Sequence, residues 1–215
     1  MDQLDKFICI FSGLETAYGT YRVESQNAKG KSVGKAIVVR QPPTKDLWQK
    51  HFDVVEPSLG IIPIRADNSC IWGCIDIDTY PLDLEALVQK IQKLKLPLVC
   101  CRSKSGGAHV FAFTKDPVPA GEMQDYLTGC AALMGESGRE IFPKQREVLV
   151  SRGDTGNFLN LCYHNSERTV RYAIKGDGSA ASLNEFFEMY EAHVQEKLVL
   201  PKVPAKADAP ASDGP

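Results

Sequence analysis

The spacing of hydrophobic residues divides the chain into short strands separated by a few helices. Residues 19–23 and 36–39 alternate or run apolar with β-branched side chains, and the polar loop between them predicts a β-hairpin. Residues 59–64 have the length and composition of a buried strand, and after a turn residues 70–78 are expected to return as the next strand. The predicted strands are 19–23, 36–39, 59–64, 70–78, 98–102, 110–113, 139–142 and 157–163.

Helical spacing is clearest at residues 82–94, where leucine, isoleucine and valine recur every three or four positions. Ser182 and Glu185 form the pattern of a capping box, which predicts a last helix from 182 to about 197. Residues 7–11 are either a first strand or the end of a helix. Strands and helices interleave, and this favours the α+β class with a mixed or antiparallel sheet. The remaining helices are expected at 44–51 and 120–134.

The composition suits one intracellular domain. The chain has 215 residues, of which 43% are hydrophobic, enough to bury a substantial core. We expect the domain at residues 1–200, followed at 201–215 by a disordered tail or a linker to a helical or helicase region. Seven cysteines with irregular spacing, without a signal peptide or an apolar run of membrane length, indicate a reducing location such as the bacterial cytoplasm.

Four of the cysteines occur as near neighbours, Cys70 with Cys74 and Cys100 with Cys101. Neither pair has the CxxC spacing that is repeated in a zinc site. We therefore interpret all four as small residues of the core.

Positive charge is concentrated near the N-terminus. The formal net charge of −2 excludes a globally basic surface, yet residues 20–50 contain seven lysines or arginines and two acids. Lys29, Lys31 and Lys35 lie in or just after the predicted hairpin loop, and they are candidates for contacts to a DNA backbone. The alternative is a basic loop that is simply solvated.

An acidic pair, Asp76 and Asp78, stands at the end of an apolar run. Residues two apart in a strand project from the same face, so the two carboxylates would lie together. Like charges this close repel each other unless a cation neutralises them, and carboxylate oxygens favour Mg²⁺ or Mn²⁺. The alternative is a strand that ends in a turn, where aspartate is common.

A polar turn with two glycines, residues 102–109, joins two predicted strands. Gly106 and Gly107 allow backbone N–H groups to approach an anion, and the neighbouring serines and cations supply further donors. His109 begins the return strand and could donate to a phosphate in either its protonated or its neutral form. The segment therefore predicts a phosphate site, and the alternative is a polar hairpin with an incidental histidine. The flanking donors are Arg102, Ser103, Lys104 and Ser105.

A third acid, Glu140, precedes apolar residues in the same way as the first pair does. It could complete a two-metal site, although a glutamate in this position is also common on an exposed strand. Further on, Asn157 follows a Gly-Asp-Thr-Gly turn, which by itself indicates only a turn.

Taken in order, these motifs resemble the archaeo-eukaryotic primase superfamily, and more narrowly the primase-polymerase domains of bacteriophages, plasmids and mobile elements. The resemblance covers about residues 7–190. It departs from the family at 161–164, where Leu-Cys-Tyr-His replaces the usual Leu-Pro-Tyr-Phe. The matching phrases are Ile62-Pro63-Ile64-Arg65, Asp76-Ile77-Asp78, 103–109 (Ser-Lys-Ser-Gly-Gly-Ala-His), 140–145 (Glu-Ile-Phe-Pro-Lys-Gln) and 156–161 (Gly-Asn-Phe-Leu-Asn-Leu).

The resemblance implies a fold and a set of roles. The fold would be an RRM-like catalytic core with a flanking N-terminal α/β unit. Asp76, Asp78 and Glu140 would hold two divalent ions, Mg²⁺ or Mn²⁺, while Ser105 and His109 would bind the triphosphate. The other residues implied at the nucleotide are Gly106, Gly107, Lys144 and Asn157, with Arg65, Arg102, Lys104 and Gln145 as less specific matches.

The function implied is template-directed nucleotidyl transfer, in a DNA primase and polymerase of a phage or mobile-element replication system. Its partners would be a single-stranded DNA template, a primer, NTP or dNTP, and a replicative helicase in cis or in trans, with no membrane. Three alternatives stay open: a gap-filling repair polymerase of the same superfamily, a metal-dependent nuclease, and a replication-initiation module that binds nucleic acid without catalysis.

Overall fold

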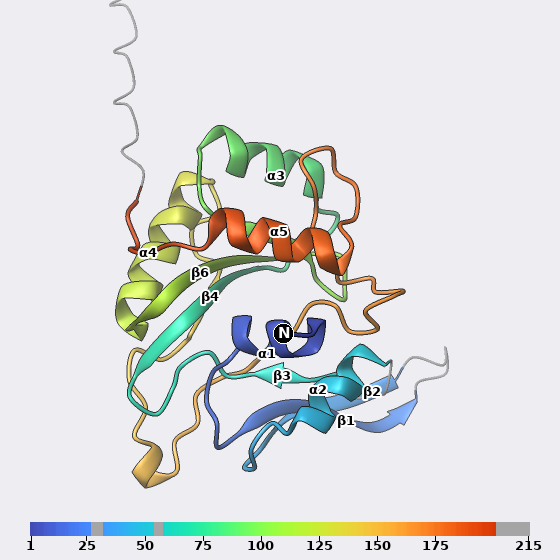
Figure 1. Ribbon diagram of the computed structural model, residues 1–215, viewed down its shortest axis with the longest axis vertical. Helices are drawn as coiled ribbons and strands as arrows, with labels where there is room; N and C mark the ends of the chain where they lie inside the picture. Colours follow the sequence, from blue (N-terminus) through green and yellow to red (C-terminus); the bar gives the residue numbers. More distant parts are fainter. Residues whose placement is uncertain (27–31, 54–57, 201–215) are drawn as a thin grey trace, which may run out of the picture.

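The computed structural model describes residues 1–26, 32–53 and 58–200, with side chains omitted at 22–26 and 32–34. Lys29, Lys31 and the segment 201–215 lie outside the described residues. The described chain forms two four-stranded sheets with helices packed on them (Figure 1). The strands within each sheet pair antiparallel, which confirms the α+β class.

The first sheet has the strand order β2-β1-β3-β8. Its strands are β1 (Tyr18–Gln26), β2 (Ser32–Val39), β3 (Gly60–Ile61) and β8 (Leu159–Asn160). The predicted hairpin is confirmed, because β1 and β2 pair along their whole length. Because β8 comes from late in the chain, this sheet is not built from the N-terminal part alone.

The strand β3 is shorter than the predicted 59–64, and it does not pair with the strand that follows it. The chain leaves the sheet after Ile61, since the carbonyl of Ile62 accepts the N–H of Leu14 at 2.9 Å. Ile62 and Ile64 are instead buried in a separate small apolar cluster. The run is therefore buried as predicted, but only its start is strand.

The predicted strand 157–163 is also reduced, to β8. Tyr163 has a positive φ of 55°, a left-handed conformation that cannot continue a strand. Its hydroxyl donates to the carbonyl of Ala181 at 2.9 Å, which ties this turn to the segment before the last helix.

The second sheet has the strand order β5-β6-β4-β7. Its strands are β4 (Ser69–Ile77), β5 (Val99–Arg102), β6 (Ala108–Pro119) and β7 (Glu140–Phe142). The helix α3 (Leu84–Lys93) connects β4 to β5, and α4 (Ala120–Leu133) connects β6 to β7. The chain order is thus β-α-β-β-α-β, with β4 and β6 in the centre of the sheet.

Alternate residues of β4 enter different cores. Ile75 and Ile77 pack with α3 and α4, whereas Trp72 and Cys74 pack with α1 (Gln3–Ile10) and α5 (Leu183–His193). In Figure 1, α1 lies between the two sheets. Asp76 has the same alternation as Cys74, so it belongs to the face that is turned toward the first sheet.

The helices agree with the predicted ones except at their ends. Residues 7–10 are the end of α1, with Phe11 as its C-cap, and α2 (Lys45–Phe52) buries Trp48 and Phe52. The capping box of α5 is confirmed, but the helix ends at His193 rather than near 197. It ends early because Gln195 turns onto the edge of β6, where its N–H donates to the carbonyl of Phe113 at 3.0 Å.

The seven cysteines are free thiols, and the four interpreted as core residues are buried. Among the described residues, no helix is both long enough and apolar enough to cross a bilayer.

Candidate active site

Strand register brings three of the predicted side chains into one row. Asp76 of β4 pairs with His109 of β6 on one side and with Glu140 of β7 on the other. Directly paired residues of antiparallel strands project from the same face, so the three side chains are neighbours. We call these residues the acidic row.

Asp76 is the least favourably placed member of the acidic row. Its side chain is only 16% exposed, and its Oδ1 is buried without a hydrogen-bond partner. The nearest ring nitrogen, Nε2 of His109, is 3.5 Å from this oxygen. Burial, followed by the charges of Asp78 and Glu140, raises the pKa of Asp76 to about 7.

His109 is buried, and its ring meets the edge of Phe111 with centroids 6.0 Å apart. Burial, followed by the positive charge of Arg171, lowers the pKa of His109 to about 4. Of the two forms left open by the sequence, the structure favours the neutral one at physiological pH. A ligand would therefore meet a single ring N–H rather than a cation.

Asp78 lies just beyond the last residue of β4 and is exposed. The expectation that the strand extends through Asp78 is thus one residue too long. Its Oδ1 accepts a hydrogen bond of 2.7 Å from the hydroxyl of Tyr80, and the side chain of Ser105 lies near that hydroxyl. Tyr80 therefore links the second carboxylate to the glycine loop, a role that its place in a turn sequence did not reveal.

The glycine loop, residues 103–107, closes tightly over the end of β4. Ser103 donates its N–H to the carbonyl of Gly107 at 2.8 Å, and Gly106 donates to the carbonyl of Ser103 at 3.1 Å. Gly106 has a φ of 97°, and a Cβ on Gly107 would lie 2.3 Å from the carbonyl oxygen of Ile77. Both positions therefore require glycine, although the amide of Gly106 is used within the turn.

The side chains of this loop differ in their accessibility. Lys104 and Ser105 are exposed, whereas the hydroxyl of Ser103 is buried without a hydrogen-bond partner. The guanidinium of Arg102 lies beside the loop, where it donates to the carbonyl of Val170 at 3.0 Å and to the carbonyl of Ser103 at 3.4 Å.

Lys144 holds the exposed end of the acidic row. Its Nζ lies 2.7 Å from Oε2 of Glu140 and 5.0 Å from the centroid of the Phe142 ring. Beside it, Gln145 and Asn157 are paired, with the N–H of Asn157 donating to Oε1 of Gln145 at 3.0 Å.

Arg65 is not brought to the acidic row. Its guanidinium donates to the hydroxyl of Ser12 at 2.8 Å, and its N–H bonds the carbonyl of Ser69 at the start of β4. Asp76 is seven residues further along that strand, which corresponds to roughly 23 Å of extended chain.

A cavity of about 360 Å³ lies between the two sheets at the acidic row. The second sheet and the residues after it supply Asp76, His109, Phe142 and Lys144 to its wall. The first sheet and the residue pair before β8 supply Ala36, Val38, Asn157, Phe158, Leu159 and Asn160.

Lys35 is exposed but does not face this cavity. Ala36 and Val38 line it, and side chains alternate along a strand, so Lys35 projects from the opposite face of β2. Its register partner on β1 is Arg22. The predicted contact of Lys35 with DNA would therefore involve the outer face of the first sheet.

The residues of the acidic row fit a hard divalent cation in their chemistry. In the described parts of the chain, no three carboxylate, imidazole or thiol groups are already gathered around one point. However, Asp76 presents a buried oxygen without a partner, and Asp78 and Glu140 lie close enough to raise its pKa. A cation bound here would relieve both penalties, provided that Lys144 releases Glu140.

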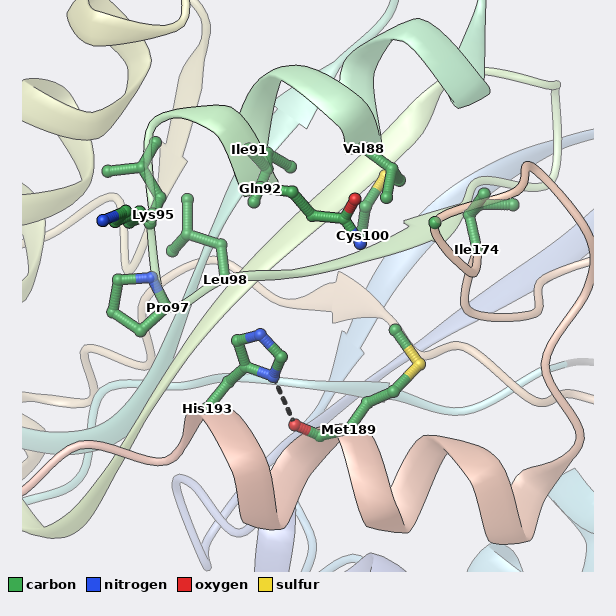
Figure 2. A pocket seen from close by; sticks show the side chains of 12 residues that line it. Val88, Ile91, Gln92, Lys95, Pro97, Leu98, Cys100, Ile174, Met189 and His193 are labelled. Atoms are coloured by element: carbon green, nitrogen blue, oxygen red, sulfur yellow. Dashed lines mark hydrogen bonds between the residues drawn. The ribbon is translucent and has the colours of Figure 1, made fainter.

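A second hollow, of about 340 Å³, lies between α3 and α5, and none of the residues predicted to bind metal, nucleotide or DNA lines it (Figure 2). Its walls are largely apolar, with Val88 and Ile91 on α3 facing Met189 on α5. His193 is bonded through Nδ1 to the carbonyl of Met189 at 2.7 Å.

The fold and the cavity define a class: an α+β domain in which two antiparallel sheets meet at a carboxylate-bearing cleft. A family model described as the archaeo-eukaryotic primase domain of TOTE conflict systems matches residues 14–194. The chain belongs to this archaeo-eukaryotic primase family, whose members are typically nucleotidyltransferases that use divalent metals.

Among solved structures, the chain is similar to the archaeo-eukaryotic primase domain of the primase-polymerase of cyanophage S-2L. The two are 13% identical, the match covers 87% of this chain and 96% of that one, and the TM-score is 0.50. This likeness concerns the fold. No curated protein matches the chain.

Proposed function

We propose that the chain is a template-directed nucleotidyltransferase that adds NTP or dNTP to the 3′ end of a primer on single-stranded DNA. The observation that carries the proposal is the acidic row, in which Asp76 keeps an unpaired buried oxygen between His109 and Glu140. Family membership supports it. In this proposal the second sheet with α3 and α4 is the RRM-like catalytic core.

Each residue has a proposed role in this reaction. Asp76, Asp78 and Glu140 would hold two Mg²⁺ or Mn²⁺ ions, which when bound activate the 3′ hydroxyl and neutralise the leaving pyrophosphate. Neutral His109 would donate its ring N–H to a triphosphate oxygen, with Ser105 beside it. The loop donors and cations that complete this proposed cradle are Arg102, Lys104, Gly106, Gly107, Lys144, Gln145 and Asn157.

Lys144 has a further proposed part. Its ammonium is paired with Glu140 at 2.7 Å, so one cation already compensates this carboxylate. If Glu140 held a metal ion instead, Lys144 would be free to donate to the triphosphate, because Lys144 lines the same cavity as Asp76 and His109.

The setting of the reaction is also part of the proposal. The matching family is described as that of TOTE conflict systems, whereas the similar structure comes from a cyanophage. We place the domain, residues 1–200, in a phage, mobile-element or conflict-system context, with a replicative helicase as its predicted partner. The outer face of β2 with Lys35 is the proposed place for contacts to the DNA backbone.

A primer-extension assay tests the proposal. Wild type and Asp76→Asn are incubated with a primed template, dNTPs and Mn²⁺, and with Asp125→Asn as a control on the exposed face of α4. We expect extension by wild type and the control, and none by Asp76→Asn. Degradation of the primer by wild type would instead indicate a nuclease, and binding without either reaction would indicate a non-catalytic module.

A further inference from the structure

The first sheet forms the wall of the cavity opposite the acidic row, and one row of residues runs across all four of its strands. Register across the first sheet places Val38, Gly19, Gly60 and Asn160 side by side, one from each strand. The two central members of this row have no side chain. The sheet therefore has a flat floor of backbone at its centre, with an apolar residue at one end and an amide at the other.

The ring of Phe158 fills this floor. A Cβ on Gly19 would lie 1.9 Å from Cγ of Phe158, and a Cβ on Gly60 would lie 2.3 Å from its Cδ2. The ring consequently lies directly on both glycines, where any larger residue would displace it. Phe158 is nevertheless only half-buried and lines the cavity together with Val38 and Asn160.

The cavity thus has two unlike walls. One carries Asp76, His109 and Lys144, and the other is an aromatic and aliphatic shelf with exposed amides at its edge. A ligand that satisfies both must combine a charged or metal-binding part with a flat, uncharged, hydrogen-bonding part. A volume of about 360 Å³ limits it to the size of a single nucleotide unit.

We propose that the Phe158 shelf, made of Phe158 on Gly19 and Gly60 with Val38 beside it, binds a nucleobase by stacking. This inference rests on the proposed function and assigns the base subsite of the same cavity. Stacking tolerates every base because each has a π face, so the shelf supplies affinity without sequence preference. Asn160, at the edge of the shelf, lines the same cavity and supplies an amide for the edge of the base.

The base has two possible sources, the incoming nucleotide and the template, and one set of measurements separates them. Affinities for dATP and for inorganic tripolyphosphate are measured with Mn²⁺ for wild type and Phe158→Ala. We expect the affinity for dATP to fall roughly tenfold or more, with tripolyphosphate unchanged, if the incoming base stacks on the shelf. If the template base does, Phe158→Ala weakens binding of a primer–template with a templating base but not of one with an abasic site there.

Two further variants guard against a folding defect. Phe158→Trp keeps an aromatic surface and should retain affinity, whereas Phe158→Leu keeps apolar bulk but loses the ring and should behave like Phe158→Ala. Leu149→Ala, an exposed apolar truncation outside the cavity, is the matched control. Thermal denaturation verifies that each variant is folded.

The outcomes distinguish the shelf from the proposed function. If folded Phe158→Ala and Phe158→Leu bind dATP and both DNA substrates as wild type does, the shelf is overturned even if extension is normal. The shelf proposal is also wrong if wild type binds dATP no better than tripolyphosphate and binds the primer–template equally well with and without a templating base. A wild type that binds dATP through Phe158 but adds no nucleotide would support the shelf and refute the proposed function.

Discussion

At the scale of single residues, the acidic row is held in an unfavourable electrostatic arrangement. Asp76 is largely buried, has an oxygen without a partner and has two further carboxylates nearby. Its raised pKa corresponds to a free-energy penalty on the ionised form of this side chain in the folded protein. Residues that lower stability in this way are characteristic of functional sites.

Asp76→Asn should therefore make the protein more stable in EDTA while abolishing nucleotide addition. At pH 8 the ionised carboxylate is repelled by Asp78 and Glu140, and removing its charge should raise the free energy of unfolding by on the order of 2 kcal/mol. Urea denaturation measures this. Asp125→Asn, which loses an ion pair with Arg146, should show no gain. Equal or lower stability of Asp76→Asn would contradict this account of the row.

Tyr80→Phe should reduce catalysis without altering the fold. The hydroxyl of Tyr80 donates to Asp78 and lies near Ser105, and Tyr80 is 52% exposed, so its loss removes an orienting contact rather than core packing. A hydrogen bond to a charged group contributes about 1.5–3 kcal/mol, so we expect roughly a tenfold or larger fall in kcat/KM for extension. Tyr172→Phe is the control outside the cavity, and unchanged kcat/KM in Tyr80→Phe would show that Asp78 is positioned without it.

At the scale of elements, the junction between α2 and the first sheet depends on a buried histidine. Nδ1 of His51 accepts the N–H of Leu59 at 3.1 Å, so Nε2 carries the proton and donates to the carbonyl of Cys162 at 2.8 Å. One neutral ring thus connects the helix with the chain entering β3 and the chain leaving β8. Burial, with smaller contributions from His164 and Arg171, lowers the pKa of His51 to about 3.

This histidine predicts a loss of stability in mild acid. Below the ordinary pKa of 6.5 the unfolded chain binds a proton at His51, while the folded protein excludes it until about pH 3. The contribution of His51 to the free energy of unfolding should therefore fall between pH 6.5 and pH 4, by on the order of a few kcal/mol. Buried His109 acts in the same direction, whereas Asp76, whose pKa is raised, acts in the opposite one. In His51→Gln, the melting temperature at pH 7 should be lower but its slope with pH shallower. A slope equal to that of wild type would exclude His51 as a source.

At the scale of the whole molecule, the two sheets contribute unlike halves of one cavity. The second sheet supplies charge through the acidic row, and the first supplies the Phe158 shelf. α1 packs between the sheets and helps to fix their separation (Figure 1). The cavity has room for one nucleotide unit.

This size predicts that residues 1–215 extend primers but initiate them poorly. Initiation must hold two free nucleotides on a template, and the second would bind with an association cost of several kcal/mol and no duplex stacking to offset it. The described residues provide one glycine loop with cations, the segment 102–109. Dinucleotide synthesis on unprimed template should require far higher nucleotide concentrations than extension. Similar requirements for both reactions would overturn this prediction.

The sequence alone determined the features that depend on near neighbours. The hairpin of β1 and β2, the apolar stripe of α3 and the capping box of α5 follow from alternation, helical spacing and a cap three residues away. The acidic pair was found in the same way, from two carboxylates at the end of an apolar run. Such patterns reflect interactions within about one helical turn or a few strand residues, so they can be recognised from the sequence without knowing the fold.

Only the tertiary structure decided which distant residues meet. Register puts Glu140 and His109 beside Asp76, and the recruitment of β8 to the first sheet carries Phe158 onto Gly19 and Gly60. It also left Arg65 at the far end of β4 and turned Lys35 away from the cavity. The alternation of a strand fixes which side chains share a face, because a shift by one residue would reverse them all. The choice of which distant strands pair is made by the long-range packing of the two cores, and no local pattern encodes it.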